Sequence, residues 1–454
     1  MINRSIAPLP TETKSFLIPE IEKHTLSNGV EIFFVHKNNL PIIHMSVLVE
    51  AGSKYDPAAK AGLAYLTSLL IDEGAGEFNA LQLSDEFEKM GSILSISADQ
   101  DHINFSLLSL TENFNHSTYL LGKILTDPRF DEKDFNREKK KVLDRILQLK
   151  DDAGYLASTV FEKIIFHNSC YESPELGNSA TVDHISNQDI IDFYKSAFTA
   201  NNTKIILVGN IPVESAIEQI EKTIGDLNNK SHEINAFVSP SKPGSKYYII
   251  DKKDSAQCEI RIGHTAKKRT AEDYIATRIM NTILGGQFSS RINLNLREDK
   301  GFTYGANSAF SYYKESGLFE IHTAVNIENS AEAVQEILKE VNGIRKEITD
   351  KEIDFAKSYL IKQFPSRFET FSQITRNIET LVIHSLDFSE LENFVRKIAE
   401  TDNKDILTAA QKNIVPDDLI IVLCGEKNKI LSQLKDKLNV EAVELNNEGI
   451  PIKK

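Results

Sequence analysis

Residues 204–209 read Lys-Ile-Ile-Leu-Val-Gly, and residues 420–425 read Ile-Ile-Val-Leu-Cys-Gly. Apart from Lys204, each run is apolar, rich in β-branched residues and ends in glycine, which is typical of a buried strand that runs into a turn. The runs lie 216 positions apart, from 204 to 420, and the same offset aligns Asp189 with Asp405. Because this offset is close to half of the 454-residue chain, the sequence predicts two duplicated domains.

Each half begins with predicted strands. In the first half, the runs 21–26 and 30–36 flank Asn28-Gly29, a pair that favours a hairpin with a type I′ turn. In the second half, residues 246–251 and 257–263 have the composition of strands.

Helical patterns follow the strands in both halves. Residues 131–135 match residues 349–353, and each segment opens a long pattern with helical spacing. Since strands come first and helices later, we expect an α+β fold with two sheets, each layered with helices, rather than a doubly wound parallel sheet.

A stretch rich in proline, serine and glycine at residues 239–245 separates the two halves. Such a composition resists both helix and sheet, so it predicts a linker. The predicted boundaries are an N-terminal extension 1–15, a first domain 16–232, a linker 233–246, a second domain 247–445 and a tail 446–454.

The composition is that of an ordinary globular protein, with 41% hydrophobic and 26% charged residues. A formal charge of −14 argues against nucleic acids and anionic membranes as partners, although acidity also simply serves solubility. Cys170, Cys258 and Cys424 are odd in number and widely spaced, so a disulfide framework is not expected. No apolar run reaches membrane-spanning length and the first residues lack a signal peptide, which favours the cytoplasm, or the periplasm if a signal peptide has been removed.

Two motifs carry the functional argument. Residues 61–73, Ala-Gly-Leu-Ala-Tyr-Leu-Thr-Ser-Leu-Leu-Ile-Asp-Glu, are apolar at helical spacing and follow a strand-like run. In the other half, residues 285–291 read Gly-Gly-Gln-Phe-Ser-Ser-Arg, and residues 296–304 read Leu-Arg-Glu-Asp-Lys-Gly-Phe-Thr-Tyr. Together they resemble the pitrilysin, or insulinase, family of metallopeptidases, including the mitochondrial-processing-peptidase type.

The resemblance implies that the helix at 61–73 occupies the place of the family's His-x-x-Glu-His zinc helix. The histidine positions hold Tyr65 and Leu69, and the position of the general base holds Ser68. Counting from the retained Arg137-Glu138 pair, the third ligand position holds Arg145. Zinc needs imidazole, thiolate or carboxylate ligands, so we expect no metal and no cofactor on this chain.

The second motif resembles the family's C-terminal signature, in which an arginine and a tyrosine seven positions later bind the substrate. Arg297 and Tyr304 have that spacing, with Gly301 between them. A guanidinium and a phenol O–H can stabilise the negative charge that develops on a peptide carbonyl oxygen during attack by water. Taken singly, the two residues also fit a surface arginine and a core tyrosine. Gly285 and Gly286 are predicted to end a helix in a turn that lets a substrate or partner backbone approach.

Other candidate sites are weaker. Residues 99–102, Asp-Gln-Asp-His, could hold a metal, but their flanks alternate like paired strands, so the sequence favours a polar strand segment or a turn. The chain has no Gly-x-Ser-x-Gly motif, which removes the usual serine-hydrolase interpretation.

The resemblance implies the non-zinc subunit of a two-subunit peptidase. Its partner would be a homologous subunit that carries the zinc, the two would face each other as half-shells, and an unfolded peptide would be the substrate. The main alternative is a catalytically inactive peptide-binding or scaffold protein, such as a homodimer. A hydrolase with a different active site is a further alternative, but the sequence contains no set of residues typical of one.

Overall fold

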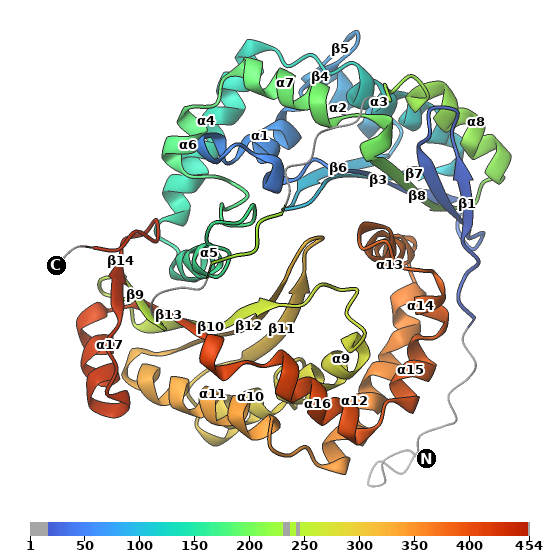
Figure 1. Ribbon diagram of the computed structural model, residues 1–454. Coiled ribbons are helices and arrows are strands. Elements are labelled where there is room, and N and C mark those ends of the chain that lie inside the picture. The colour runs from blue at the N-terminus through green and yellow to red at the C-terminus, as the bar shows by residue number, and fades with distance from the viewer. Residues whose placement is uncertain (1–16, 230–236, 242–245, 453–454) are drawn as a thin grey trace, which may run out of the picture.

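The computed structural model describes residues 17–229, 237–241 and 246–452. Figure 1 shows the N-terminal half, blue to green, above the C-terminal half, yellow to red, and each half contains a six-stranded sheet. The predicted α+β class with two duplicated domains is confirmed. The predicted extension 1–15 and residues 233–236 and 242–245 of the predicted linker lie outside the described residues.

The two sheets share one topology over five strands. The N-terminal sheet has the order β1-β2-β8-β3-β7-β6, and the C-terminal sheet has the order β11-β12-β10-β13-β9-β14. Within the five shared strands, one parallel pair (β2 with β8, β9 with β13) adjoins a run of antiparallel pairs. The strands are β1 Glu22–Thr25, β2 Glu31–His36, β3 Ile42–Val49, β6 Ile93–Ala98, β7 Ile103–Leu110, β8 Thr203–Gly209, β9 Tyr247–Asp251, β10 Gln257–Ala266, β11 Ala306–Tyr312, β12 Gly317–Asn326, β13 Ile420–Gly425 and β14 Val443–Leu445.

The sixth strand differs between the halves. In the first half it is β1, which precedes β2 and pairs with it antiparallel, whereas in the second half it is β14, near the C-terminus, which pairs with β9 parallel. The predicted hairpin is confirmed, but the predicted type I′ turn is wrong. Gly29 alone in the turn has a positive φ, of 93°. The Gly29 N–H donates to the Leu26 carbonyl at 3.0 Å, so Ser27 and Asn28 form the turn and Gly29 follows it as a bulge.

Helices cover the sheets in both halves. The predicted offset is confirmed in α7 Asn187–Ala197 and α16 Asn403–Asn413, which begin 216 positions apart. Among the described residues, no helix is both long and apolar enough to span a bilayer. The other helices are α1 Leu63–Leu70, α2 Ala80–Lys89, α3 Phe114–Thr126, α4 Glu132–Leu149, α5 Ala153–Ile165, α6 Ser179–Asp183, α8 Val213–Ile224, α9 Tyr274–Leu284, α10 Arg291–Asn293, α11 Ser330–Ile344, α12 Asp350–Gln363, α13 Phe371–Ile383, α14 Ser389–Glu392, α15 Phe394–Glu400 and α17 Lys427–Gln433.

Each half places one helix on the sheet of the other half. Helix α5 belongs to the N-terminal half by sequence, yet it packs against β10 and β13 of the C-terminal sheet. Its residues Leu156, Val160 and Phe161 are buried in one cluster with Val422 and Cys424. The first predicted domain therefore contributes to the core of the second.

Helix α13 makes the reciprocal contact, against β3 and β8 of the N-terminal sheet. Ile374 and Ile378 of α13 share a buried cluster with Val208. At the same contact the ring of His44 lies 2.9 Å from the Thr375 hydroxyl. Burial lowers the pKa of His44 to about 4, so this ring is neutral at neutral pH.

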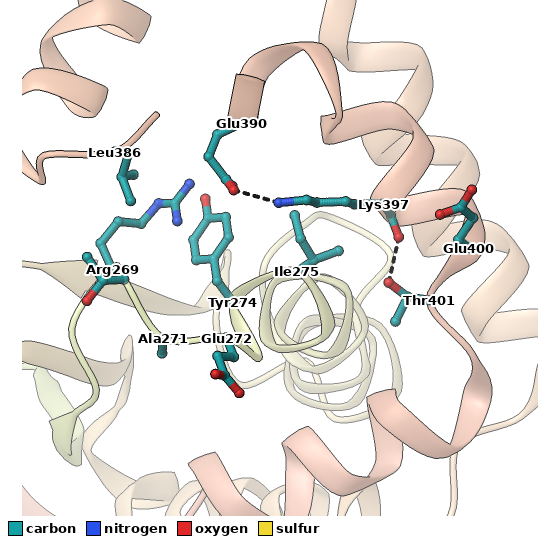
Figure 2. A pocket seen from close by; sticks show the side chains of 11 residues that line it. Arg269, Ala271, Glu272, Tyr274, Ile275, Leu386, Glu390, Lys397, Glu400 and Thr401 are labelled. Carbon is teal, nitrogen blue, oxygen red and sulfur yellow. Dashed lines mark hydrogen bonds and ion pairs between the residues drawn. The ribbon is translucent and has the colours of Figure 1, made fainter. Parts of the chain in front are cut away.

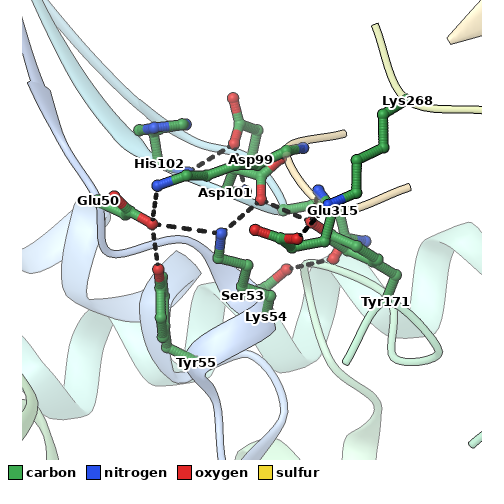
Figure 3. A network of polar contacts seen from close by, with 12 residues as sticks. Glu50, Ser53, Lys54, Tyr55, Asp99, Asp101, His102, Tyr171, Lys268 and Glu315 are labelled. Atoms are coloured by element: carbon green, nitrogen blue, oxygen red, sulfur yellow. Dashed lines mark hydrogen bonds and ion pairs between the residues drawn. The ribbon is translucent and has the colours of Figure 1, made fainter. Parts of the chain in front are cut away.

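Two equivalent hairpin tips, β6–β7 and β11–β12, meet where the halves join, and Figure 3 shows their contacts. Residues 99–102 form the first tip, where the Asp99 carboxylate accepts from the backbone N–H groups of Asp101 and His102 at 2.7 Å. Of the two predicted alternatives, a polar strand segment or a turn, the structure has the turn, between β6 and β7. The Asp101 carboxylate then accepts from the Lys314 N–H of the second tip at 2.8 Å and from the Tyr171 hydroxyl at 2.9 Å.

Ion pairs strengthen this contact between the tips. The Lys54 ammonium lies 2.8 Å from Asp101, and the Lys314 ammonium donates to Glu50 at 2.5 Å. The Tyr55 hydroxyl also donates to Glu50, at 2.6 Å. Burial alone would raise the pKa of the Glu50 carboxyl, but the hydrogen bonds from Lys314 and Tyr55 outweigh it and hold this pKa at about 2.

Glu50→Gln should therefore destabilise the protein at neutral pH and reduce its acid sensitivity. Because the folded-state pKa lies below the ordinary value of 4.5, Glu50 adds stability above pH 4.5 that is lost as the pH falls towards 2. We expect the free energy of unfolding at pH 7 to fall by about 1–3 kcal/mol. Chemical denaturation at a series of pH values measures both effects.

The control is Glu218→Gln, which removes a carboxylate that is 69% exposed and paired with Lys222 on the surface. It should leave stability nearly unchanged. Equal behaviour of the two variants would show that the Glu50–Lys314 contact does not hold the halves together.

Candidate functional site

The helix predicted to replace the zinc helix is α1, which is shorter than the apolar pattern at 61–73. Its first turn begins at Gly62, with a φ of 100°, and is capped by Asp56 from the preceding loop. The Asp56 carboxylate accepts from the backbone N–H groups of Gly62, Leu63 and Ala64 at 2.8–3.0 Å. These contacts fix the helix against the loop that follows β3.

The positions on α1 that were predicted to correspond to the family's zinc-binding residues serve packing. Tyr65 and Leu69 are half-buried against the N-terminal core. Ser68 is buried, and its hydroxyl donates to the Tyr65 carbonyl at 2.7 Å. Arg145 is exposed on α4, the helix that packs against α1. The described residues contain no group of three or more His, Cys, Asp or Glu side chains arranged to hold a metal ion.

The Arg137-Glu138 pair, by which the third ligand position was located, lies in a cluster of charges between α1 and α4. The Arg137 guanidinium lies 2.5 Å from Glu73 and 2.9 Å from Glu138. Burial, together with the adjacent negative charges of Glu73 and Glu138, raises the pKa of Asp72 to about 6. The pair thus joins the end of α1 to α4, and sequence reasoning did not identify Asp72 and Glu73 as members of this cluster.

The arginine–tyrosine motif lies in the other half of the chain. Arg297 belongs to a π-helical segment, Leu294–Asp299, that continues α10. Its guanidinium lies over the ring of Phe288, 4.3 Å from the ring centre, and 2.9 Å from the Glu298 carboxylate. Phe288 is itself 65% exposed, so this stack is at the surface. Short π-helical segments occur frequently at functional sites.

Tyr304 lies in the loop between this segment and β11. It is 95% exposed, and its hydroxyl has no hydrogen-bond partner within the described ranges. Gly301, with a φ of 65°, turns the chain into this loop. Tyr304 is therefore not a core tyrosine, and its ring contributes little to the packing of the fold.

The structure places the two motifs apart. Figure 1 shows α1 in the N-terminal half and α10 in the C-terminal half, so Arg297 and Tyr304 are not assembled with Tyr65, Ser68 and Leu69. Within one chain, the former zinc helix and the arginine–tyrosine segment do not form a single site.

Gly285 and Gly286 end helix α9, as predicted. Their N–H groups donate to the Asn281 carbonyl at 3.0 and 2.7 Å. A Cβ on Gly285 would lie 2.4 Å from the Ser308 hydroxyl oxygen, and the Ser308 N–H donates to the Gly285 carbonyl at 3.0 Å. The backbone that approaches this turn is thus that of β11 in the same chain.

Comparison with known proteins identifies the family. Residues 32–179 match the model described as "Insulinase (Peptidase family M16)", and residues 184–360 match "Peptidase M16 inactive domain". The chain belongs to the insulinase family, peptidase family M16. The positions predicted from the sequence to correspond to the family's zinc ligands hold Tyr65, Leu69 and Arg145, and none of these side chains is a zinc ligand.

Three curated relatives have low sequence identity to this chain, but their matches cover most of its length. The chain is 24% identical over 79% of its length to an uncharacterized zinc protease YmxG of Bacillus subtilis, of which the match covers 87%. It is 23% identical over 89% of its length to a protein of Helicobacter pylori described as a non-peptidase homolog, of which the match covers 94%. A probable mitochondrial-processing peptidase subunit beta of Arabidopsis thaliana is 21% identical over 90% of this chain and 78% of its own length.

Solved structures share the fold. A peptidase M16 inactive domain from Pseudomonas fluorescens has a TM-score of 0.84 at 25% identity, and the match covers 89% of this chain and 98% of that one. A protease from Helicobacter pylori has a TM-score of 0.84 at 20% identity, with 90% and 100% coverage.

Purified without chelator, the chain should contain no stoichiometric zinc, because Tyr65, Leu69 and Arg145 offer no ligand. Elemental analysis measures the zinc content directly. About one tightly held zinc ion per chain would contradict this assignment of the positions.

Restoring only the histidines should not restore hydrolysis. In Tyr65→His with Leu69→His, Arg145 still supplies no third ligand and Ser68 cannot accept a proton from water. The matched comparison adds Ser68→Glu and Arg145→Glu, which supplies the full ligand set and the base. Peptide cleavage and zinc content of both variants test this, and robust cleavage by the histidine-only variant would refute it.

Proposed function

We propose that this chain is the non-zinc subunit of a two-subunit zinc metallopeptidase of the M16 family. The main observation behind this proposal is that Tyr304 is exposed and has no hydrogen-bond partner among the described residues, while Arg297 stacks on the exposed ring of Phe288. A tyrosine that contributes so little to its own fold is available to a molecule outside it. The partner would be a zinc-bearing homologous subunit, and the substrate would be an unfolded peptide.

The proposed chemistry is stabilisation of charge on the substrate. Water adds to the scissile carbonyl carbon, the C=O π bond opens, and its electron pair becomes negative charge on the oxygen. The Arg297 guanidinium and the Tyr304 hydroxyl would donate hydrogen bonds to that oxygen. The zinc held by the partner subunit would activate the attacking water.

Each residue type suits this role. Arginine keeps its charge at any accessible pH and presents several N–H donors in one plane. Stacking on Phe288 and the ion pair with Glu298 hold the guanidinium in place near the surface. Tyr304, on a loop that begins at Gly301, can adjust to a peptide held by the opposite subunit.

The alternative is a catalytically inactive peptide-binding or scaffold protein. The relative from Helicobacter pylori described as a non-peptidase homolog supports it, whereas the similarity to a mitochondrial-processing peptidase subunit supports the two-subunit enzyme. We further propose a cytoplasmic location, which the free thiols of Cys170, Cys258 and Cys424 support.

Arg297→Ala and Tyr304→Phe should each lower turnover of the assembled peptidase while leaving assembly intact. Loss of one donor to a developing oxyanion typically lowers turnover about a hundredfold or more, equivalent to roughly 3 kcal/mol. The experiment co-expresses the chain with a zinc-bearing homologue from the same organism and measures peptide cleavage by each chain alone and by the pair. Melting temperature is measured for every variant.

The matched controls are Arg396→Ala, an exposed arginine on α15 paired with Glu400, and Tyr359→Phe on α12. Both should retain full turnover. Cleavage by the pair that is unchanged in Arg297→Ala and Tyr304→Phe would exclude the oxyanion role. Absence of cleavage by any pair, together with retained peptide binding by this chain, would favour the scaffold.

A further inference from the structure

Three arginines gather around one tyrosine in the C-terminal half. The Arg269 guanidinium carbon lies 3.3 Å from the centre of the Tyr274 ring, and Figure 2 shows the two side chains stacked. Arg278, one turn along α9, donates to the Tyr274 hydroxyl at 3.0 Å. Arg278 and Arg367 each lie 5.6 Å from the centre of the Phe394 ring.

These cations repel one another. Burial lowers the pKa of Arg367, and the neighbouring charges of Arg278 and Arg269 lower it further. Contacts with aromatic faces offset only part of this cost. Three guanidinium groups this close normally require a negative charge between them.

Within the described residues, no carboxylate forms an ion pair with any of the three. Arg269 is 8% exposed, and its Nε has no hydrogen-bond partner within the described ranges. The Nε of Arg278 is likewise buried and unpartnered there. The chain contains 66 acidic residues, so a lack of carboxylates in the sequence does not explain this. A buried N–H donor without an acceptor costs free energy, and a bound ligand that accepts its hydrogen bond removes this cost.

The cluster opens to solvent through two clefts. One, of about 370 Å³, is lined by Arg269 and Tyr274 and is the pocket of Figure 2. The other, of about 360 Å³, is lined by Arg278 and Tyr274. Tyr274 therefore borders both, and a ligand in the first cleft would lie against the Arg269 side of the cluster.

The carboxylates around the first cleft do not neutralise the cluster. Glu390 is paired with Lys397 at 2.5 Å, and Glu400 is paired with Arg396 at 2.8 Å. Glu272 points away from the Arg269 guanidinium in Figure 2. The positive charge of the cluster thus remains available to a ligand.

We propose that the arginine cluster is a binding site for an oxyanion group, a phosphate or a carboxylate, carried by a small molecule. Arg269 and Arg278 supply planar N–H donors that match the geometry of both groups. The anion would accept hydrogen bonds from the unpartnered N–H donors, and its negative charge would reduce the repulsion among the three cations. The volume of the cleft accommodates an organic ligand rather than a bare ion. This site does not involve Arg297, Tyr304 or a zinc-bearing partner.

The test is calorimetric titration of the full chain, without a partner, using inorganic pyrophosphate and citrate as separate probes at low ionic strength. We expect at least one probe to bind, and which one binds identifies the source of the oxyanion. Arg269→Gln and Arg278→Gln should each weaken that binding about tenfold or more, since each removes charge-assisted hydrogen bonds. Arg129→Gln makes the same change in net charge in the N-terminal half and should leave the affinity unchanged.

Thermal unfolding with and without the probe separates binding from folding. The probe should raise the melting temperature of the unaltered chain and of Arg129→Gln, but not of the two cluster variants. If one cluster variant does not fold, the affinity of the other variant for the probe tests the proposal. Failure of both probes to bind the unaltered chain, or binding that neither cluster variant weakens, would overturn the proposal.

Discussion

The exchange of helices α5 and α13 between the two halves is the contact on which the rest of the structure depends. Strand β8 shows why. Ile205 and Leu207 face the helices of their own half, whereas Ile206 and Val208 belong to the buried cluster that contains α13. An apolar run with no polar alternation is stable only when both faces of the sheet are covered. Each half therefore supplies the cover that the other half lacks.

The duplication also determines where the halves touch. Because the two sheets share one topology, the hairpins β6–β7 and β11–β12 are equivalent, and their tips meet at the contact between Asp101 and Lys314. Helices α1 and α9 are equivalent in the same way, since each follows the strand next to β8 or β13. The former zinc helix and the helix of the arginine cluster thus occupy corresponding places in the two halves.

The charges of this acidic chain are distributed unevenly. At the contact between the tips, Lys54 and Lys314 each meet a carboxylate, so these buried charges are satisfied. Around Tyr274, the arginines have aromatic partners but no carboxylate within the described residues. Removing one partner of a buried ion pair leaves an uncompensated charge, so the first arrangement ties the two halves to each other. The second arrangement is the basis of the proposed oxyanion site.

The sequence by itself determined the duplication and the α+β class. Both follow from local patterns, β-branched runs and helical spacing, which are readable without contacts. The residues assigned to the zinc-ligand positions remain a prediction from the family resemblance. The sequence left residues 99–102 as either a polar strand segment or a turn, and it did not give the type of turn at Asn28-Gly29, where the Asn28 side-chain amide donates to the Ile224 carbonyl of α8, 196 positions away. Only the tertiary structure decided that α5 and α13 change sheets, that Asp101 joins the halves, and that Arg269, Arg278 and Arg367 share one tyrosine and one phenylalanine. Except for the contacts of Tyr274 with Arg269 and Arg278, these contacts join residues far apart in the chain, and their energies depend on distance and burial, which no local pattern contains.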